Sequence, residues 1–426
     1  MPPPNPFREL WSLRAGVTFL NHGSFGPSPV AVQDERDRWS RDIESEPMDW
    51  FVRRLETELD RVREELARFV GAKAKDLLFV DNATVGMNLV ARSLPLQPGD
   101  EILANDHEYG AVLRIWRRRC EETGAVLKIA RPPDRLVSPD DFVEPIREAI
   151  TDRTRLIVVS HVTSASAVIV PVERVCAIAR ERGVPVCVDG PHAPAAVPID
   201  LDRLGCDFYT ASLHKWLAAP FGTGFLWVRP RHQPRLQPVV TSWGGSLAGR
   251  APHWHDEFNW SGTRDYGPWL AIPAAIRFFR ELPQDERRAQ WLRAALSEWG
   301  PAPGELPGFD SATADGWALF RAYSHRLAAR ARRLVEGVTG LAAPIPDSPQ
   351  WYGPMISLPL PDTIPAVSHG TMHPLQHALW TEHRIEAPIV QWRDRRWIRV
   401  SCHFYNTPED LDTLAHALTE TLPRFG

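Results

Sequence analysis

Short apolar runs alternate with helical patterns through the first half of the chain. The runs occupy residues 77–81, 101–104, 125–130, 155–162, 184–189 and 207–211. Helical patterns lie between them, over residues 84–94, 110–123, 139–150 and 171–182. Strands that are apolar on both faces and alternate with helices indicate a mostly parallel sheet covered on both sides. The pattern therefore predicts an α/β fold.

The two ends of the chain follow other patterns. Residues 1–28 are rich in Pro and Gly and are predicted to form an irregular arm, followed by helices from Pro29 and over 49–70. After residue 282 come a polar helical stretch at 284–299, a Pro/Gly-rich loop, a helix near 318–337, strands near 355–360 and 397–404, and a helix over 408–421. We predict an arm (1–28), a large domain (29–282) and a smaller C-terminal α+β domain (283–426), with 283–317 as an insertion.

Composition narrows the class of protein. The chain has 426 residues, which suggests more than one domain, and a formal net charge of −4. So small a charge argues against nucleic acid or an anionic membrane as the main partner. No apolar run approaches the roughly 18 residues that span a bilayer. The start of the chain lacks signal-peptide features and the five cysteines are scattered singly, so we expect a cytoplasmic protein without a disulfide framework.

Lysine is rare in this chain and one lysine has an unusual setting. Lysine occurs only at positions 73, 75, 128 and 215, whereas arginine supplies every other basic side chain. An amine differs from a guanidinium because it can lose its proton and attack a carbonyl. Lys73, Lys75 and Lys128 have polar or alternating neighbours typical of surface, but Lys215 lies among small and apolar residues in TASLHKWLAAP. Lys215 is therefore the candidate nucleophile.

Asp189 ends a buried strand 26 positions before Lys215. A carboxylate at that position needs a partner, either the backbone of the next turn, which it would cap, or the cationic nitrogen of a ligand. An Asp for a pyridinium nitrogen and a Lys for a Schiff base are the two groups that pyridoxal phosphate (PLP) requires of a protein. The pair thus favours PLP as the cofactor.

A phosphate site is predicted where the first strand of the sheet turns into a helix. Asn82, Ala83 and Thr84 would place backbone N–H groups and a hydroxyl at the positive end of that helix. Ser212 and His214, which flank Lys215 in SLHK, supply two more hydrogen-bonding groups, and the glycines of GTGF permit close approach of the backbone.

These residues resemble a known family. DGPHAPA followed by SLHKW is similar to the aminotransferase class V group of fold-type-I PLP enzymes, in particular to its isopenicillin-N-epimerase-like branch. Further matching motifs occur in order along nearly the whole chain: LNHGSFGPSP, DNATVGMN, NDHEYGA, SWGG, NWSGTRDYGPWL and RVSCHFYNTPED. The resemblance implies a large PLP-binding domain with a mostly parallel sheet and a smaller C-terminal domain.

The resemblance also implies a role for each matching residue in holding the cofactor. Lys215 would form the Schiff base and Asp189 would pair with the ring nitrogen, while His107 would stack on the ring and Tyr109 would line the same pocket. The cofactor would further be held by Thr84, Ala83, Ser212 and His214 at the phosphate, by His192, and by Thr263 from the neighbouring subunit. His192 follows Pro191, where the family commonly has a small residue, so its geometry is open. Sites shared between subunits imply a homodimer.

For the substrate, the resemblance implies a small molecule that is an amino acid or is derived from one. Arg399 would grip its carboxylate, for which a guanidinium is well shaped. Asn21 and His22 would approach it from the arm, which would serve as a substrate loop.

The same site permits several reactions at the α-carbon. Epimerisation is predicted first because the motifs are closest to that branch, and β-elimination by a C–S lyase and transamination stay open as alternatives. A cysteine desulfurase of this group needs a thiol on a loop before the carboxylate-binding arginine. No cysteine lies between Cys206 and Cys402, and Cys402 follows Arg399, so desulfuration through a protein persulfide is disfavoured.

Other classes of protein are less well supported. A hydrolase would show GxSxG, but residues 244–248 read GGSLA. His253 and His255 form an HxH pair without a third spaced ligand, so we expect no metal site. Neither GxGxxG nor a P-loop motif is present. A non-catalytic binding protein on the same fold remains an alternative, against which Lys215, Asp189 and Arg399 together argue.

Overall fold

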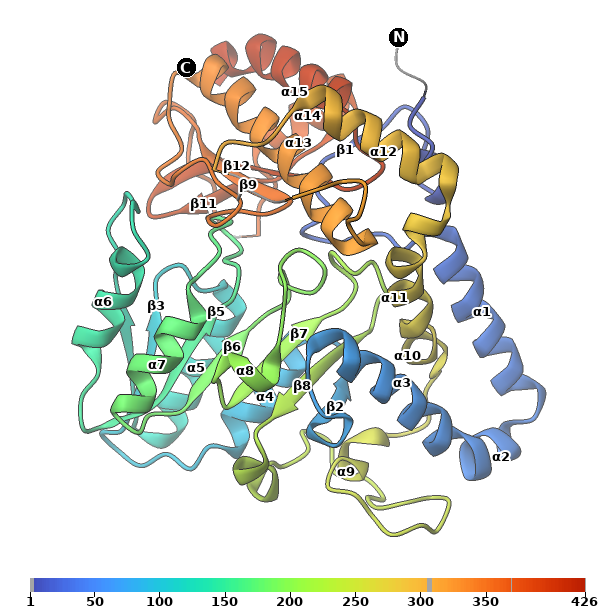
Figure 1. The fold of residues 1–426 in the computed structure, drawn as a ribbon. Helices are drawn as coiled ribbons and strands as arrows, with labels where there is room; N and C mark the ends of the chain where they lie inside the picture. The colour runs from blue at the N-terminus through green and yellow to red at the C-terminus, as the bar shows by residue number, and fades with distance from the viewer. Residues whose placement is uncertain (1–3, 305–308, 369, 426) are drawn as a thin grey trace.

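A seven-stranded sheet forms the centre of the larger part of the molecule in the computed structural model, which describes residues 4–304, 309–368 and 370–425 (Figure 1). Its order is β2-β8-β7-β6-β5-β3-β4. The strands span β2 Leu77–Val80, β3 Glu101–Asn105, β4 Val126–Ala130, β5 Thr154–Ser160, β6 Val186–Asp189, β7 Phe208–Ser212 and β8 Gly224–Val228. β8 is antiparallel to both of its neighbours, and the other neighbouring pairs are parallel. The predicted α/β class is confirmed.

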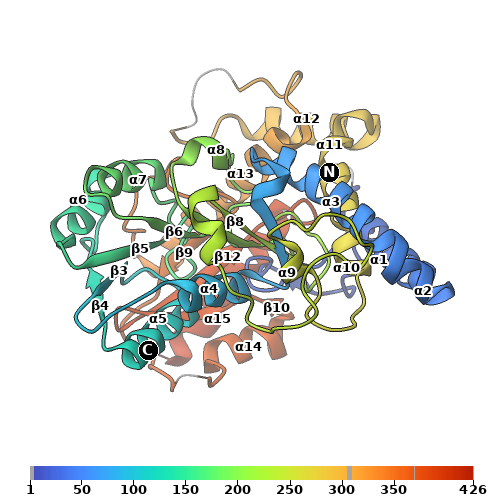
Figure 2. The same cartoon turned by 90° about the horizontal axis from the view of Figure 1, so that it is seen from below.

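Both faces of this sheet are covered by helices (Figure 2). Leu78 and Val80 of β2 pack with helices α4 and α5, whereas Leu77 and Phe79 pack in the apolar cluster on the opposite side. The helices of the large part are α1 Val30–Ser45, α2 Pro47–Asp49, α3 Leu55–Val70, α4 Ala83–Ser93, α5 Gly110–Thr123, α6 Asp140–Ala149, α7 Val172–Glu181, α8 Leu201–Leu204, α9 Asp256–Asn259, α10 Gly267–Leu270 and α11 Ile272–Arg280. Burial on two sides explains why the strands read as nearly continuous apolar runs.

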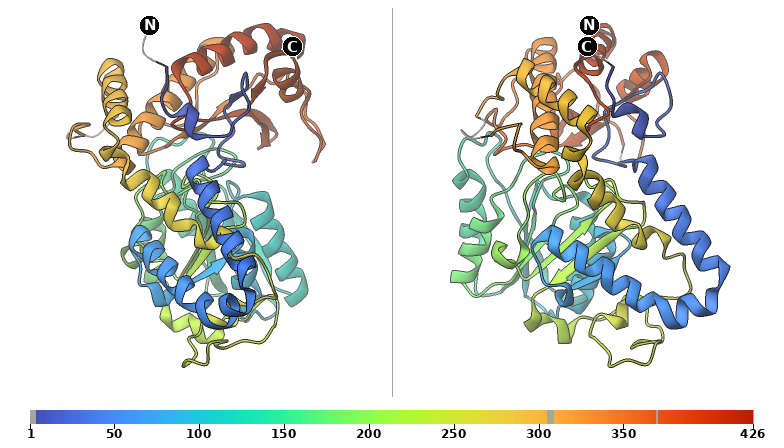
Figure 3. Two further views of the ribbon diagram at one scale, coloured as in Figure 1. Left: turned by 90° about the vertical axis from the view of Figure 1, so that its right-hand side faces the viewer. Right: turned by 45° about the vertical axis from the view of Figure 1, so that its right-hand side comes forward.

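The smaller C-terminal part lies above the carboxyl ends of the parallel strands (Figure 3). Its antiparallel sheet has the order β11-β12-β9. Its elements are α12 Glu286–Trp299, α13 Gly316–Thr339, β9 Met355–Pro359, α14 Pro374–His383, β10 Ile385–Glu386, β11 Ile389–Trp392, β12 Arg395–Ser401 and α15 Pro408–Thr421. The arm joins this part, because β1 (Thr18–Phe19) pairs in parallel with β10. The arm therefore connects both parts of the molecule near the edge where ligands bind in such folds.

The boundaries of the predicted elements agree closely with the structure, and several short elements were missed. The first helix begins one residue later than predicted, at Val30, with Pro29 in the N-cap position. Strands β1, β8, β10 and β11 and helices α8 to α11 and α14 were not predicted. The proposed insertion contains α12, while residues 305–308 of it lie outside the described residues. Within the described part of the chain, no helix is both long and apolar enough to cross a membrane.

Candidate active site

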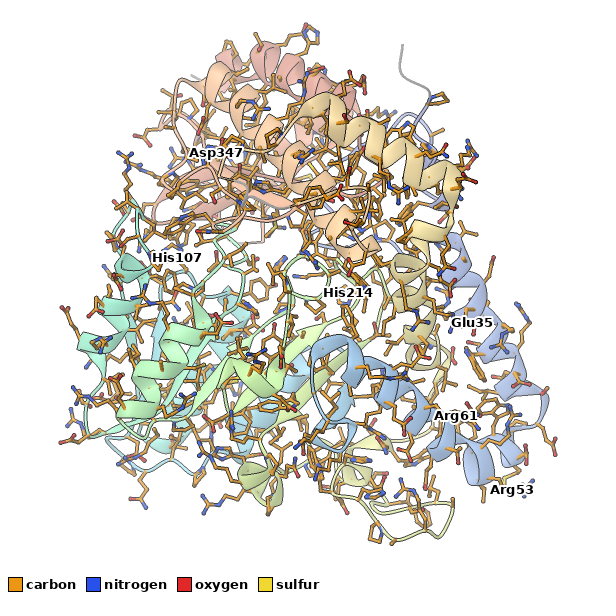
Figure 4. The ribbon with its side chains drawn as sticks, in the orientation of Figure 1. Glu35, Arg53, Arg61, His107, His214 and Asp347 are labelled. Atoms are coloured by element: carbon orange, nitrogen blue, oxygen red, sulfur yellow. The ribbon has the colours of Figure 1, made fainter. Side chains whose placement is uncertain are left out.

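The edge of the large sheet that faces the small domain gathers most of the predicted site residues. β6 ends at Asp189, β7 ends at Ser212, and the loop after β7 carries His214 and Lys215. β6 and β7 are parallel neighbours, so their carboxyl ends lie side by side. Figure 4 shows His214 in this region, between the sheet and the small domain.

The Lys215 amine is held in a buried, cationic environment. Its Nζ lies 2.9 Å from Nε2 of His192. Burial and the Arg399 cation lower the pKa of Lys215 to about 7, against the opposing effect of the Asp189 carboxylate. His192 is itself buried, and burial together with Lys215 holds its pKa well below the ordinary value. A substantial fraction of the amine is therefore uncharged near neutral pH, and the uncharged form is the nucleophile.

This lowered pKa predicts selective modification of Lys215. In apoprotein treated with limiting acetic anhydride, we expect the rate of Lys215 acetylation to rise with pH through a midpoint near pH 7, since the neutral amine is the reactive form. Peptide mass spectrometry separates Lys215 from the exposed Lys73 and Lys75, which serve as internal references. Replacing Arg399 with Gln removes a cation and should move the Lys215 midpoint upward. A midpoint near the ordinary lysine value in the unchanged protein would contradict the described environment.

Asp189 is a buried carboxylate without a protein partner. It is 3% exposed, and its side chain takes part in no hydrogen bond with any residue that the structure describes. Burial raises its pKa to about 7, and Lys215 acts in the opposite direction. A buried acid that binds neither backbone nor side chain needs a cationic or hydrogen-bonding ligand. The alternative role as a cap for the next turn is therefore not the one that the structure displays.

The predicted phosphate site is built at the start of α4. Ser212 Oγ accepts a hydrogen bond from the Ala83 N–H at 3.0 Å, and the Asn82 side chain caps the helix by accepting from the Val85 N–H at 3.0 Å. Thr84 is exposed in the first turn, where the helix dipole favours an anion. His214 Nδ1 is buried without a partner in the described structure. These groups surround one helix end and suit a phosphate.

Arg399 lies on β12 of the small domain and is 5% exposed. Its Nη1 donates to the Ser164 carbonyl at 2.9 Å and to Ser164 Oγ at 3.2 Å, and its Nη2 donates to Ser24 Oγ. Among the described residues no carboxylate forms an ion pair with this guanidinium, and its buried Nε has no acceptor. Burial lowers its pKa to about 10. An oriented, buried cation without a counter-ion suits a substrate carboxylate.

The contacts of the His107 ring come from β11 of the small domain and from the loop after β5. The His107 ring contacts Trp392 at a centroid distance of 4.4 Å, and its Nδ1 lies 2.8 Å from Ser166 Oγ. Figure 4 shows His107 well apart from His214, towards one end of the region between the two parts. Trp392 packs against the histidine ring, and the predicted stacking of His107 on the cofactor ring stays a prediction. Tyr109, in the same turn, is 49% exposed and raises the pKa of Arg399.

The two predicted residues of the arm have different surroundings. Asn21 donates from Nδ2 to Glu386 Oε1 at 3.4 Å, and its buried Oδ1 has no partner among the described residues. His22 is fully buried, and both of its ring nitrogens have protein partners, Tyr405 and the backbone of Lys215. Both ring nitrogens of His22 are therefore engaged by the protein, and its predicted role at the substrate stays a prediction.

Thr263 is exposed on the loop before α10. The next residue, Arg264, forms an ion pair with Asp81 and lies 4.3 Å over the Trp269 ring. The loop is therefore anchored close to the start of the phosphate site, with the Thr263 side chain directed to solvent. Its predicted contact with a second subunit stays a prediction.

Three residues near the site were not predicted from the sequence. Ser24 and Ser164 orient Arg399, and both lie in loops that the sequence marks only as small and polar. Glu108 accepts from the Ser160 N–H at 2.8 Å and lies 2.7 Å from Ser160 Oγ. Burial raises the pKa of Glu108 to about 8, with a further contribution from Asp189. In the sequence, the only indication that Glu108 belongs to the site is its position between His107 and Tyr109, which were both predicted.

The residues that resemble motifs of other enzyme classes make structural contacts instead. Ser246, in the near-match to GxSxG, donates to Glu56 at 2.7 Å. His253 and His255 stack on each other at 5.3 Å. Across the residues that the structure describes, no group of three His, Cys, Asp or Glu side chains could hold a metal ion.

The donor set fits PLP. It offers an amine with a lowered pKa at Lys215, an unpartnered buried carboxylate at Asp189 for the ring nitrogen, and Thr84, Ser212 and His214 for the phosphate. Each is a group that the cofactor requires. When bound, PLP stabilises negative charge at the α-carbon of an attached amino acid.

Comparison with known proteins agrees with this site. Residues 29–296 match the family described as Aminotransferase class-V. The isopenicillin N epimerase of Amycolatopsis lactamdurans is 36% identical, covering 97% of each chain. A cysteine desulfurase of Salmonella newport is 31% identical over 58% of this chain and 62% of its own. A solved structure of a C-DES variant with glycine covalently linked to its PLP cofactor has a TM-score of 0.72 at 19% identity, covering 98% of this chain and 100% of that one. The chain therefore belongs to the aminotransferase class-V family, and it is a PLP-dependent enzyme.

Proposed function

We propose that this enzyme epimerises the α-carbon of an amino acid or an amino-acid derivative. The observation that carries the proposal is the buried Arg399, a cation without a carboxylate partner in the described structure, whose charge acts directly on Lys215. A substrate carboxylate on Arg399 would place the adjacent α-carbon near the only amine of the site. The similarity to the Amycolatopsis isopenicillin N epimerase supports this reaction.

Different side chains bind the substrate and transfer protons. Arg399 binds and orients the carboxylate, with Ser24 and Ser164 fixing the guanidinium. The Lys215 amine, hydrogen-bonded to His192, removes or returns the proton on one face of the α-carbon. Epimerisation also needs a proton donor on the other face, and Tyr109 is the candidate because it is exposed and acts electrostatically on Arg399. Asp189 holds the proton on the cofactor's ring nitrogen.

An incubation in D₂O tests the proposed reaction. We expect deuterium at the α-carbon of a substrate that is otherwise intact, with loss of optical activity, because the abstracted proton exchanges with solvent before it returns. Proton NMR and chiral chromatography over a panel of amino acids measure both quantities. Release of ammonia and a keto acid would instead establish elimination, and formation of a new amino acid from an added keto acid would establish transamination.

Carbon–sulfur lyase chemistry is the second candidate. The relative from Salmonella named cysteine desulfurase supports it. All five cysteines of this chain are buried, however, and burial raises the pKa of the Cys187 and Cys206 thiols well above the ordinary value. A reaction of this kind would therefore proceed by elimination, without a protein thiol that accepts sulfur.

We further propose a cytoplasmic homodimer in which Thr263 of one subunit reaches the phosphate of the other. The exposed position of Thr263 on a loop that Arg264 anchors supports this arrangement. Sedimentation equilibrium should give twice the mass of the chain. Replacing Thr263 with Ala should weaken PLP retention about tenfold, as expected for one hydrogen bond to a charged group. A monomer that retains PLP fully would contradict this proposal.

A further inference from the structure

The backbone of the loop that carries the catalytic lysine is held at one carbonyl group. The Lys215 carbonyl accepts two hydrogen bonds, from the Ala218 N–H at 2.7 Å and from His22 Nε2 at 2.9 Å. Ala218 has φ +54°, a left-handed conformation that residues with a Cβ rarely adopt. A turn of this kind persists only where surrounding contacts determine it. We call residues 213–219 the lysine loop.

The chemistry of its two partners defines the protonation of His22. A carbonyl oxygen can only accept, so Nε2 of His22 must carry the hydrogen. Burial lowers the pKa of His22 to about 3, so the ring is neutral and Nδ1 carries no hydrogen. Nδ1 then accepts from the Tyr405 hydroxyl, which lies at 2.8 Å. A directional chain of hydrogen bonds thus runs from Tyr405 of the small domain through the arm to Lys215.

The His22 ring is also fixed by packing. It is 0% exposed, stacks on His403 at 4.2 Å and lies 5.3 Å from the Trp216 ring. A Cβ at Gly26 would lie 2.5 Å from His22 Nε2 and 2.7 Å from the His214 carbonyl oxygen, so the arm can approach the lysine loop this closely only with glycine there. Three separate segments of the chain therefore meet at one imidazole.

We infer that His22 is a positioning residue, which fixes the main chain of the lysine loop and through it the Lys215 amine. The neighbouring Ser24 accepts a hydrogen bond from Arg399, so the arm sets the lysine and the carboxylate-binding arginine relative to each other. The effect of His22 on catalysis rests on the proposed role of Lys215. The effect of His22 on the backbone of the lysine loop does not depend on that role.

Two substitutions separate the hydrogen bond from the ring. Glutamine can place an N–H donor at the position of Nε2, whereas asparagine reaches only the position of Nδ1. We expect His22→Asn to increase hydrogen exchange of the Ala218 amide in apoprotein about tenfold and to lower kcat about tenfold or more with little change in KM, because one buried hydrogen bond is lost. His22→Gln should restore both quantities. His416→Asn, the same change at an exposed residue of α15, is the matched control and should alter neither.

Each outcome of these experiments either supports or overturns the inference about His22. Normal exchange and normal kcat in His22→Asn would overturn it, as would a folded His22→Gln variant that is as impaired as His22→Asn, since the ring would then act by packing alone. Faster exchange in His22→Asn with rescue by Gln supports it even where no substrate is turned over. In that case the role of His22 in fixing the lysine loop is supported, and the proposed reaction of the site is contradicted.

Discussion

Replacing Lys215 with alanine is expected to abolish covalent binding of PLP and to lower kcat by about 10⁴-fold, the upper end of what one proton-transferring group supplies. No other amine can substitute, because the only other lysines lie at positions 73, 75 and 128 and none of them is near the site. Both roles require an uncharged amine, and the lowered pKa of Lys215 makes this form accessible near neutral pH. The visible absorbance of purified protein and the mass of the borohydride-treated chain measure the first effect, and racemisation assays measure the second.

The matched control is Lys73→Ala, which removes an exposed lysine and should leave absorbance, mass shift and rate unchanged. Lys215→Ala should fold normally, since it removes a buried group that pays a desolvation cost whenever it is charged. Two results would show that another residue carries the cofactor. One is a protein that keeps full activity after borohydride has removed its visible absorbance. The other is a Lys215→Ala variant that still gains the mass of reduced PLP.

The core of the site could be predicted because it follows from the sheet. Strands buried on both faces read as apolar runs, and their carboxyl ends mark the edge where ligands bind. Asp189 and Lys215 follow two such runs, and the structure places them within electrostatic reach of each other. β8 was missed because its first residues, Gly224 and Phe225, were interpreted as part of the Gly-rich GTGF segment.

Side-chain direction could not be predicted where distant segments decide it. His107, Glu108 and Tyr109 are consecutive, and a motif cannot say which of them faces the cleft. Trp392 of the small domain contacts His107, which is buried, whereas Tyr109 is exposed. The same holds for His22, whose partners Tyr405 and Lys215 come from the far end and the middle of the chain.

Replacing Asp189 with asparagine is expected to lower kcat by about 10²–10³-fold, which is the usual effect of removing one preorganised electrostatic group. The amide keeps the size of the side chain but cannot hold a proton on a ring nitrogen by its charge. Arg399 is not altered, so KM should change little. The measurement is steady-state kinetics on variant protein loaded with PLP, together with its content of bound cofactor.

The same substitution should stabilise the apoprotein, and this opposite effect identifies Asp189 as a functional residue. Burial raises the pKa of Asp189 to about 7, above the value of an unfolded aspartate, so the folded state favours the protonated acid. The wild-type apoprotein therefore loses stability as the pH rises from about 4 to about 7, whereas asparagine has no charge to bury. We expect Asp189→Asn to have the higher melting temperature at pH 8 and the difference to vanish near pH 4. A variant that melts lower at pH 8 would show that the carboxylate stabilises the fold, and a turn-capping role would then explain its position.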